Sequence, residues 1–189
     1  NEMRMRPAQE LGIDTFYYSI KAAAREMCAP LQNQIVTTGR ARTEEGVKIF
    51  ALDDYGYGKP GGCQGINCGH TMTPFIPGVN YMPDIDDDLK GLTEEQAIEN
   101  ANVQSKQRAM ERAIRVSKER LHVAETMHNE ELTAKYKTRL TEQKRALKSY
   151  VDKYPFLYRD REREKYHDDP LTKTREAIRQ RDILAKKHA

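Results

Sequence analysis

One stretch decides most about how this chain folds: Gly61-Gly62-Cys63-Gln64-Gly65-Ile66-Asn67-Cys68-Gly69-His70, continued by Pro74-Phe75-Ile76-Pro77-Gly78. Two of the three cysteines and one of the five histidines of the chain lie within it. Cys, Asn and His side chains ligate metals or carry out chemistry, and glycine lets a backbone bend tightly around them. The stretch therefore indicates a loop whose role is catalysis, metal binding or architecture.

Metal binding is the first chemical interpretation of this loop. Four residues separate Cys63 from Cys68, and His70 follows Cys68 after one more residue. Structural zinc sites usually show two ligand pairs with spacings of about two to four residues, whereas here there is one cluster, so Cys28 would have to come from a distant segment. The sequence predicts Cys28, Cys63, Cys68 and His70 as candidate zinc ligands. The alternative is that Cys68 is a small buried apolar residue, with Asn67 and His70 satisfying backbone groups of the loop.

Catalysis by the same loop finds less support. Cys68 and His70 form a Cys/His pair, but residues i and i+2 often point apart, and the sequence offers no obvious third group to orient them. A phosphate-binding loop over Gly56 to Gly65 is not supported either, because Lys59 lies inside the loop and no Gly-Lys-Ser/Thr follows. We expect no catalytic residue here. The other histidines are scattered along expected helices and read as surface residues: His122, His128, His167 and His188.

The charge of the chain is distributed unevenly. Its 189 residues carry a net charge of +3. Residues 1–103 contain nine Lys and Arg against fifteen Asp and Glu, a net −6, and residues 104–189 contain 23 against 14, a net +9. A basic half indicates an acidic partner such as nucleic acid. The alternative is that these charges are the solvated faces of amphipathic helices.

Composition also bounds the class of protein. No run approaches the roughly 18 apolar residues of a membrane span, so no membrane partner is expected. The segment Met3 to Pro7 is not followed by the apolar core of a secretory signal. Three cysteines, an odd number, do not suggest a disulfide framework. We expect a reducing, intracellular origin.

The front of the chain predicts an α+β fold. Strands are expected over 14–20, 34–38 and 47–52, where aromatic and β-branched residues gather. A short helical turn is expected over 22–27, a polar connection over 39–46, and a glycine-rich loop over 55–62. Residues 1–83 are therefore predicted to form a small, irregular α+β module that carries the Cys/His loop.

The back of the chain predicts helices. Residues 84–92 form an acidic linker, and Thr93 is the expected N-cap of a first helix. One stripe of this helix, spaced by three and four residues, is Met110, Ile114, Ser117, Leu121, Ala124 and His128. Asn129 is the expected cap of a second helix that ends before Pro155. The prediction is an antiparallel helical hairpin over 93–154, followed over 155–189 by a basic tail with two short charged helices on either side of Pro170.

Several motifs, taken together, resemble one family. The segments Gly65-Ile66-Asn67-Cys68-Gly69-His70 and Pro74-Phe75-Ile76-Pro77-Gly78 resemble the signature of the phage minor capsid protein 2 family, which belongs with the head-morphogenesis proteins named after protein F of phage Mu. Further similar segments are Gly12-Ile13-Asp14-Thr15-Phe16, Ala24-Arg25-Glu26-Met27-Cys28, Leu31-Gln32-Asn33-Gln34, Tyr55-Gly56-Tyr57-Gly58 and the helical segment from Gln104 to Arg115. The resemblance covers residues 11–165.

The chain also departs from the family pattern. The family usually has histidine where this chain has Cys28, tryptophan where it has Leu31 and arginine where it has Gly69, and Lys21 stands in for another family histidine. Cysteine in place of histidine keeps metal ligation chemically open. The resemblance assigns a structural motif to Gln32, Gly65, Asn67, Cys68, His70, Pro74, Phe75, Pro77 and Gly78.

The resemblance implies a non-enzymatic minor component of a tailed-phage or prophage head. Such a protein would act in head assembly near the portal, with portal, major capsid or scaffold proteins as partners and several copies per virion. It would lie in the capsid interior or portal region, and in the host cytoplasm during assembly. Double-stranded DNA is a further expected partner, bound without sequence specificity through basic side chains. The candidates for DNA or partner contact are Lys106, Arg108, Arg112, Arg115, Arg159, Arg161 and Arg163.

Two other function classes stay open on the sequence. One is an effector resembling NAD-dependent ADP-ribosyltransferases, carried in the phage head and suggested by the glycine-rich loop. The other is a zinc-stabilised nucleic-acid-binding module, suggested by the four candidate zinc ligands beside the basic half. No cofactor is expected for the minor head component, and zinc is expected for the nucleic-acid-binding module.

Overall fold

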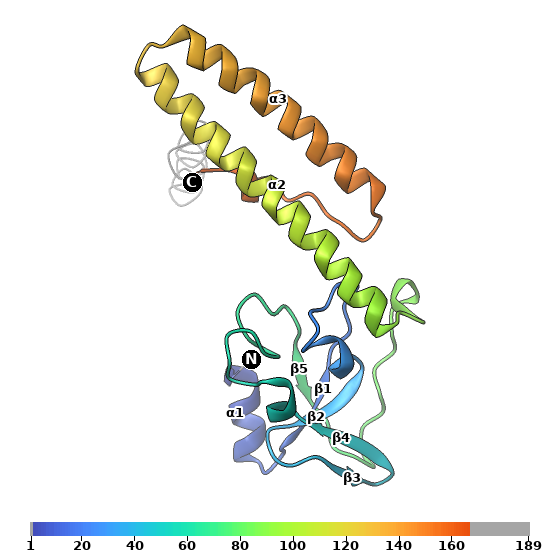
Figure 1. Ribbon diagram of the computed structural model, residues 1–189. Coiled ribbons are helices and arrows are strands. Elements are labelled where there is room, and N and C mark those ends of the chain that lie inside the picture. Colours follow the sequence, from blue (N-terminus) through green and yellow to red (C-terminus); the bar gives the residue numbers. More distant parts are fainter. Residues whose placement is uncertain (1, 167–189) are drawn as a thin grey trace, which may run out of the picture. The chain divides into compact units, whose positions relative to one another are not determined.

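The computed structural model describes residues 2–166, which belong to two compact units (Figure 1). The first unit ends at Val103 and the second begins at Gln104. The division falls within a long helix, so each unit is described separately. The predicted boundaries near residues 83, 92 and 154 stay predictions.

The first unit is built on a mixed five-stranded sheet with strand order β3-β4-β2-β1-β5. The strands are β1 (Thr15–Tyr18), β2 (Gln34–Thr37), β3 (Arg42–Glu44), β4 (Val47–Ala51) and β5 (Met72–Pro74). β1 pairs antiparallel with both β2 and β5, while β2 and β4 run parallel, with Ile35 opposite Ile49. The predicted α+β class is confirmed.

Alternate residues of the central strands fill two cores. Phe16, Tyr18 and Val36 belong to the larger core, whereas Tyr17 and Ile35 belong to the smaller one. Successive side chains of a strand point to opposite faces, so the sheet is covered on both. The larger core is completed by helix α1 (Glu2–Glu10), the 3-10 helix η1 (Ala29–Leu31), the loop at Cys63 and the start of α2.

Two strands and one helix were not expected from the sequence. The polar connection predicted over 39–46 contains β3, which forms a hairpin with β4 through Glu45 and Gly46. Both turn residues have positive φ, 48° and 75°, the backbone twist that a two-residue hairpin requires. β5 was hidden in the proline-rich segment, and α1 had no predicted counterpart. The helical turn predicted over 22–27 lies further along the chain: residues 22 and 23 form a bend, the N–H groups of Cys28 and Ala29 donate to the Arg25 carbonyl oxygen, and the 3-10 helix η1 follows Cys28.

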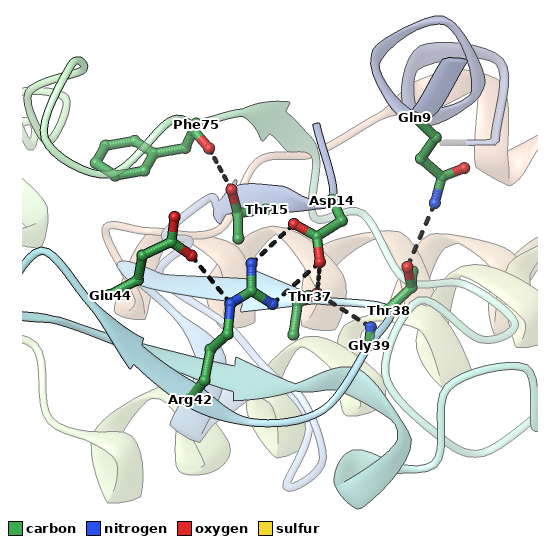
Figure 2. Close-up of polar contacts among 9 residues, drawn as sticks. All are labelled: Gln9, Asp14, Thr15, Thr37, Thr38, Gly39, Arg42, Glu44 and Phe75. Carbon is green, nitrogen blue, oxygen red and sulfur yellow. Dashed lines mark hydrogen bonds and ion pairs between the residues drawn. The ribbon is translucent and has the colours of Figure 1, made fainter. Parts of the chain in front are cut away.

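Asp14 and Thr15 form polar contacts on the two sides of β1, as Figure 2 shows. Asp14 accepts bonds from Arg42 Nη2 at 2.8 Å, Arg42 Nη1 at 3.0 Å and Thr37 Oγ1 at 3.2 Å. The next residue, Thr15, donates to the carbonyl oxygen of Phe75 at 2.5 Å. Two adjacent polar side chains thus join β1 to β3 on one side and to the residue after β5 on the other.

The second unit contains the helical hairpin. α2 (Glu94–Thr126) starts in the first unit, and α3 (Glu130–Lys153) follows it after a short turn. Both predicted caps are confirmed: Thr93 and Gln96 exchange hydrogen bonds at the start of α2, and Asn129 accepts from the Leu132 N–H at the start of α3. The reciprocal pair at Thr93 is a capping box, which satisfies two orphan groups at once.

The antiparallel arrangement is visible in contacts at both ends of the hairpin. Lys137 pairs with Glu125 near the turn, at 3.3 Å. Towards the other end, the Lys106 ammonium lies 5.4 Å from the centroid of the Tyr150 ring. Figure 1 shows the two helices side by side along this length.

The predicted stripe on α2 is largely confirmed. Ile114, Ser117 and Ala124 are buried, whereas Met110 and Leu121 are half-buried. His128 is exposed, as expected for a surface histidine; it does not share the buried stripe, because it lies beyond the end of α2 with a φ of +53°. Of the two predicted tail helices, the first is the 3-10 turn η4 (Arg161–Glu164). The second, Leu171 to Lys187, lies outside the described residues.

Candidate functional site

The glycine-rich loop closes on itself through backbone contacts that only glycine allows. A Cβ added at Gly62 would lie 1.8 Å from the carbonyl oxygen of Gly56, and one added at Gly65 would lie 2.5 Å from that of Pro60. Neither distance leaves room for a side chain. Gly65 was predicted as part of the structural motif, and this packing gives it a physical reason.

Three predicted ligands of the loop region come together in space. Cys28 precedes η1, while Cys68 and His70 lie just before β5. The two sulfur atoms are 3.8 Å apart, and Cys68 Sγ is 3.4 Å from His70 Nδ1. All three donor atoms lie within 4.8 Å of one another. Cys28 and His70 are buried, and Cys68 is half-buried.

Gln32 orients the histidine of this cluster. Its Oε1 atom lies 3.0 Å from His70 Nε2 and accepts the Lys21 backbone N–H at 2.6 Å. A backbone N–H can only donate, so the Gln32 atom is the oxygen, and Nε2 of His70 must carry the proton that it shares with that oxygen. Nδ1 is thereby directed at Cys68. Sequence reasoning expected Cys68 and His70 to point apart and saw no third group, because Gln32 lies 38 residues away from His70 along the chain.

Tyr18 packs against the cluster and contacts both His70 and Cys68. Its ring lies 4.9 Å from that of His70, centroid to centroid, and its hydroxyl is 3.7 Å from Cys68 Sγ. Burial raises the pKa of Tyr18, so the phenol stays protonated and can donate to the sulfur. Sequence reasoning placed Tyr18 in a strand and did not connect it with the site.

The two clustered thiols titrate as a pair. The hydrogen bond with Cys28 lowers the pKa of Cys68, while burial opposes it. The same Cys28–Cys68 bond raises the pKa of Cys28, and burial adds to it. The proton of the pair is thus held on Cys28, and the negative charge is favoured on Cys68.

Cys63 stands apart from the three clustered ligands. It is fully buried, and its thiol donates to the carbonyl oxygen of Leu52 at 3.5 Å. Burial raises the pKa of Cys63 to about 11. The structure therefore brings together three of the four candidate ligands, and Cys63 packs in the core beside them.

The remaining motif residues have architectural surroundings. Phe75 and Pro77 are buried, and Pro74 is the last residue of β5. Asn67 and Gly78 have positive φ, 61° and 76°, a conformation that asparagine and glycine tolerate best. Lys21 lies over Gly69: a Cβ at that glycine would be 3.0 Å from the lysine Nζ.

The basic residues proposed for partner contact fall into two groups. Two are engaged within the fold: Arg108 pairs with the buried Glu111 at 3.0 Å, and Arg159 pairs with the buried Glu164 at 2.6 Å. The Arg163 guanidinium lies 3.3 Å from Asp160, and Lys106 lies over Tyr150. The second group consists of exposed residues that form no ion pair with any described residue: Arg112, Arg115 and Arg161.

Sequence reasoning missed a denser basic surface on α3. Residues 135–148 carry six basic side chains against the single acid Glu142, and all six are exposed. Lys137, Lys144 and Lys148 follow one another at spacings of seven and four, which places them on one side of the helix. A count of charges over residues 135–148, made separately from the rest of the chain, could have identified this basic surface from the sequence.

The hairpin also bears an apolar hollow close to its turn. Its volume is about 390 Å³, and its lining includes Val116, Val123, Met127, Leu132 and Tyr136. Val123 and Met127 are 50% and 66% exposed. In the described part of the chain, no helix combines the length and apolar character that crossing a bilayer requires.

Comparison with known proteins shows the family. The model of the family described as phage minor capsid protein 2 matches residues 1–152, and the chain belongs to that family. It is 33% identical over 167 residues to a structural protein of Lactococcus phage LL-H, covering 87% of this chain and 43% of that protein. It is 37% identical over 118 residues to a structural protein of Lactococcus phage mv4, covering 62% of this chain and 92% of that protein.

The two relatives also show how much of a related protein this chain covers. The chain spans less than half the length of the LL-H protein. No solved structure gives a significant match to the chain. The resemblance inferred from the loop motifs is confirmed, and the chain is a member of a family of phage structural proteins.

Proposed function

We propose that this chain is a non-enzymatic component of a tailed-phage or prophage head that acts in head assembly near the portal. The family description and the two phage structural proteins similar to it support a virion role. The chain would be present in several copies per virion, in the capsid interior or at the portal, and would pass through the host cytoplasm during assembly.

The observation that carries the proposal is the apolar hollow near the turn of the hairpin. Val116 and Val123 on α2 and Met127 just after its end are substantially exposed. Large apolar side chains gathered at an accessible hollow mark protein contact sites more often than isolated ones do. We assign this surface to a head protein: the portal, the major capsid protein or a scaffold.

Incorporation into heads tests the proposal. The double variant Val123→Ser/Met127→Ser, co-expressed with the portal and capsid proteins of the same genome, should be lost from purified heads and should no longer cross-link to the portal. A matched control is Ile66→Ser/Val79→Ser, two exposed apolar residues of the first unit, which should be incorporated normally. Unchanged incorporation of the hairpin variant, with its helicity intact by circular dichroism, would contradict the proposal.

A second candidate function is contact with packaged DNA, for which the basic face of α3 is the specific observation. Lys144 and Lys148 are exposed and lie one turn apart. Each phosphate contact contributes a slope of about −0.9 to the plot of log affinity against log salt. The variant Lys144→Glu/Lys148→Glu should therefore bind duplex DNA more weakly, with a slope shallower by about 2. Arg40→Glu/Lys59→Glu, which alters two exposed bases of the first unit, is the control with an equal change of charge.

The proposal also states that the chain has no enzymatic activity. Cys28 and His70 are buried, and Tyr18 covers the ring of His70, an arrangement suited to holding the fold together. Incubation of the purified chain with labelled NAD and host extract should give neither labelled protein nor loss of NAD. Transfer of label that the wild type supports would establish the ADP-ribosyltransferase-like alternative instead.

A further inference from the structure

The cluster of Cys28, Cys68 and His70 has the dimensions of a metal site. For Zn–S bonds of about 2.3 Å and a Zn–N bond of about 2.05 Å in a tetrahedron, the sulfurs should stand about 3.8 Å apart, and sulfur and nitrogen about 3.6 Å apart. The observed separations are 3.8 Å between the sulfurs and 3.4 Å from Cys68 Sγ to His70 Nδ1. The remaining edge, from Cys28 to His70, is at most 4.8 Å and would close by about 1 Å on binding.

The neighbours of the cluster complete this geometry. A metal-bound imidazole usually donates its second N–H to an oxygen that fixes its tautomer and orientation. Here Gln32 Oε1 lies 3.0 Å from His70 Nε2 and is itself held by the Lys21 N–H. Nδ1 therefore carries the lone pair of the ring, and it lies 3.4 Å from Cys68 Sγ. The hydrogen bond from His70 to Gln32 is therefore a second observation, separate from the distances between the three donor atoms.

We propose that Cys28 Sγ, Cys68 Sγ and His70 Nδ1 bind one zinc ion per chain, with Gln32 as the positioning residue of His70 and with Cys63 outside the ligand set. Two thiolates and an imidazole favour zinc over magnesium or calcium, which take oxygen ligands. Water fills the fourth position. Each thiol that is still protonated releases its proton to solvent as its sulfur binds.

The ion would fasten two segments that are distant in sequence. Cys28 stands at the start of η1, and Cys68 and His70 stand before β5, so coordination closes a connection of about 40 residues across the first unit. Because the unfolded chain lacks a preformed site, metal binding favours the folded state. The site would thus give the glycine-rich loop a structural function that requires no turnover.

Metal content and cobalt spectroscopy test the proposal on the full chain. Protein purified under reducing conditions without chelator should contain one zinc per chain by mass spectrometry of the metal. Cobalt replacing zinc should give a thiolate-to-cobalt charge-transfer band, and removal of metal with a chelator should lower the melting temperature. Little or no zinc together with no cobalt band overturns the proposal, as does a Cys28–Cys68 disulfide that forms in preference to metal uptake.

Variants separate the three ligands from the nearby thiol. Cys68→Ser should abolish the cobalt band, and Cys63→Ser, which keeps a donor for Leu52 O, should leave stoichiometry and band intact. If Cys68→Ser fails to fold, Gln32→Ala replaces it: that change leaves every ligand in place and should weaken zinc affinity about 10- to 100-fold. Equal loss of metal in Cys63→Ser, or full affinity in Gln32→Ala, overturns the assignment.

Discussion

Each of the two units of this chain is stabilised internally by a different kind of contact. In the first unit, the decisive partners are far apart in sequence: Asp14 with Arg42, and Cys28 with Cys68. In the second unit, the contacts within each helix and its cap are three or four residues apart, as between Gln107 and Glu111 and between Asn129 and Leu132, and a few longer-range contacts such as Lys106 with Tyr150 join the helices. A helical hairpin repeats one local solution along its length, whereas the small sheet relies on a few unique approaches. Single substitutions should therefore reveal different weak points in the two units.

The largest effect is expected at the closest approach in the first unit. In Gly62→Ala, the new Cβ would meet the Gly56 carbonyl oxygen at 1.8 Å, so the backbone must move, at a cost of about 3 kcal/mol. Gly61→Ala is the adjacent control, because nothing lies within 4 Å of its added Cβ. Urea unfolding of both variants measures the difference. Similar stabilities for the two would show that the loop is not closed as described.

A smaller loss is expected in the hairpin, where a buried acid organises polar groups. Glu111 is 2% exposed and accepts hydrogen bonds from Gln107 and Arg108. Its removal in Glu111→Ala leaves these donors poorly satisfied and should cost about 2 kcal/mol. Glu119→Ala, at an exposed position of the same helix, should change stability by less than about 0.5 kcal/mol. Equal effects, measured by thermal unfolding, would argue against the buried network.

The turn of the hairpin offers a third test. Asn129 satisfies the Leu132 N–H at the start of α3, and Asn129→Ala should reduce stability by about 1 kcal/mol. Asn129→Asp keeps an oxygen in the capping position and should preserve stability. Helicity and denaturation midpoints report both effects, and a neutral alanine variant would mean that the cap contributes little.

The smallest effect is expected at Asp14, which is half-exposed. The hydrogen bonds from Arg42 lower the pKa of Asp14 below its ordinary 3.8. A carboxylate with a lowered folded-state pKa stabilises the fold above about pH 3.8, and this contribution disappears as pH falls through the folded pKa. Asp14→Asn should therefore cost less than about 1 kcal/mol at pH 7, and the cost should shrink as the pH falls below 3.8. A cost that does not depend on pH would assign the effect to packing.

The sequence predicted the second unit better than the first. The cap at Asn129 and the buried stripe through Ile114 and Ala124 follow from local rules of helix formation. In the first unit, β3 is short and polar, and β5 ends in Pro74, so neither shows the pattern of a half-buried strand. β3 pairs with β4 across a two-residue turn, whereas β5 pairs with β1, which lies far earlier in the chain.

The candidate site divides in the same way. The loop motif identified Cys68 and His70, and chemical reasoning added Cys28 and Cys63 as possible ligands. The sequence offered no means of separating Cys63 from the other three, because its partner is the backbone oxygen of Leu52. Nor did it reveal the roles of Tyr18 and Gln32, whose side chains meet the cluster only after β1 and η1 have packed.

By itself, the sequence determined the family, the α+β class and the helical hairpin, since these depend on motifs and on periodicities that lie within short segments. The tertiary structure decided which donors of the glycine-rich loop converge and which glycines admit no side chain. It also showed which of the candidate basic residues remain exposed. The physical reason is that convergence and exposure depend on distances between segments that are far apart in the chain, and these are fixed only when the sheet and the loop close around one core.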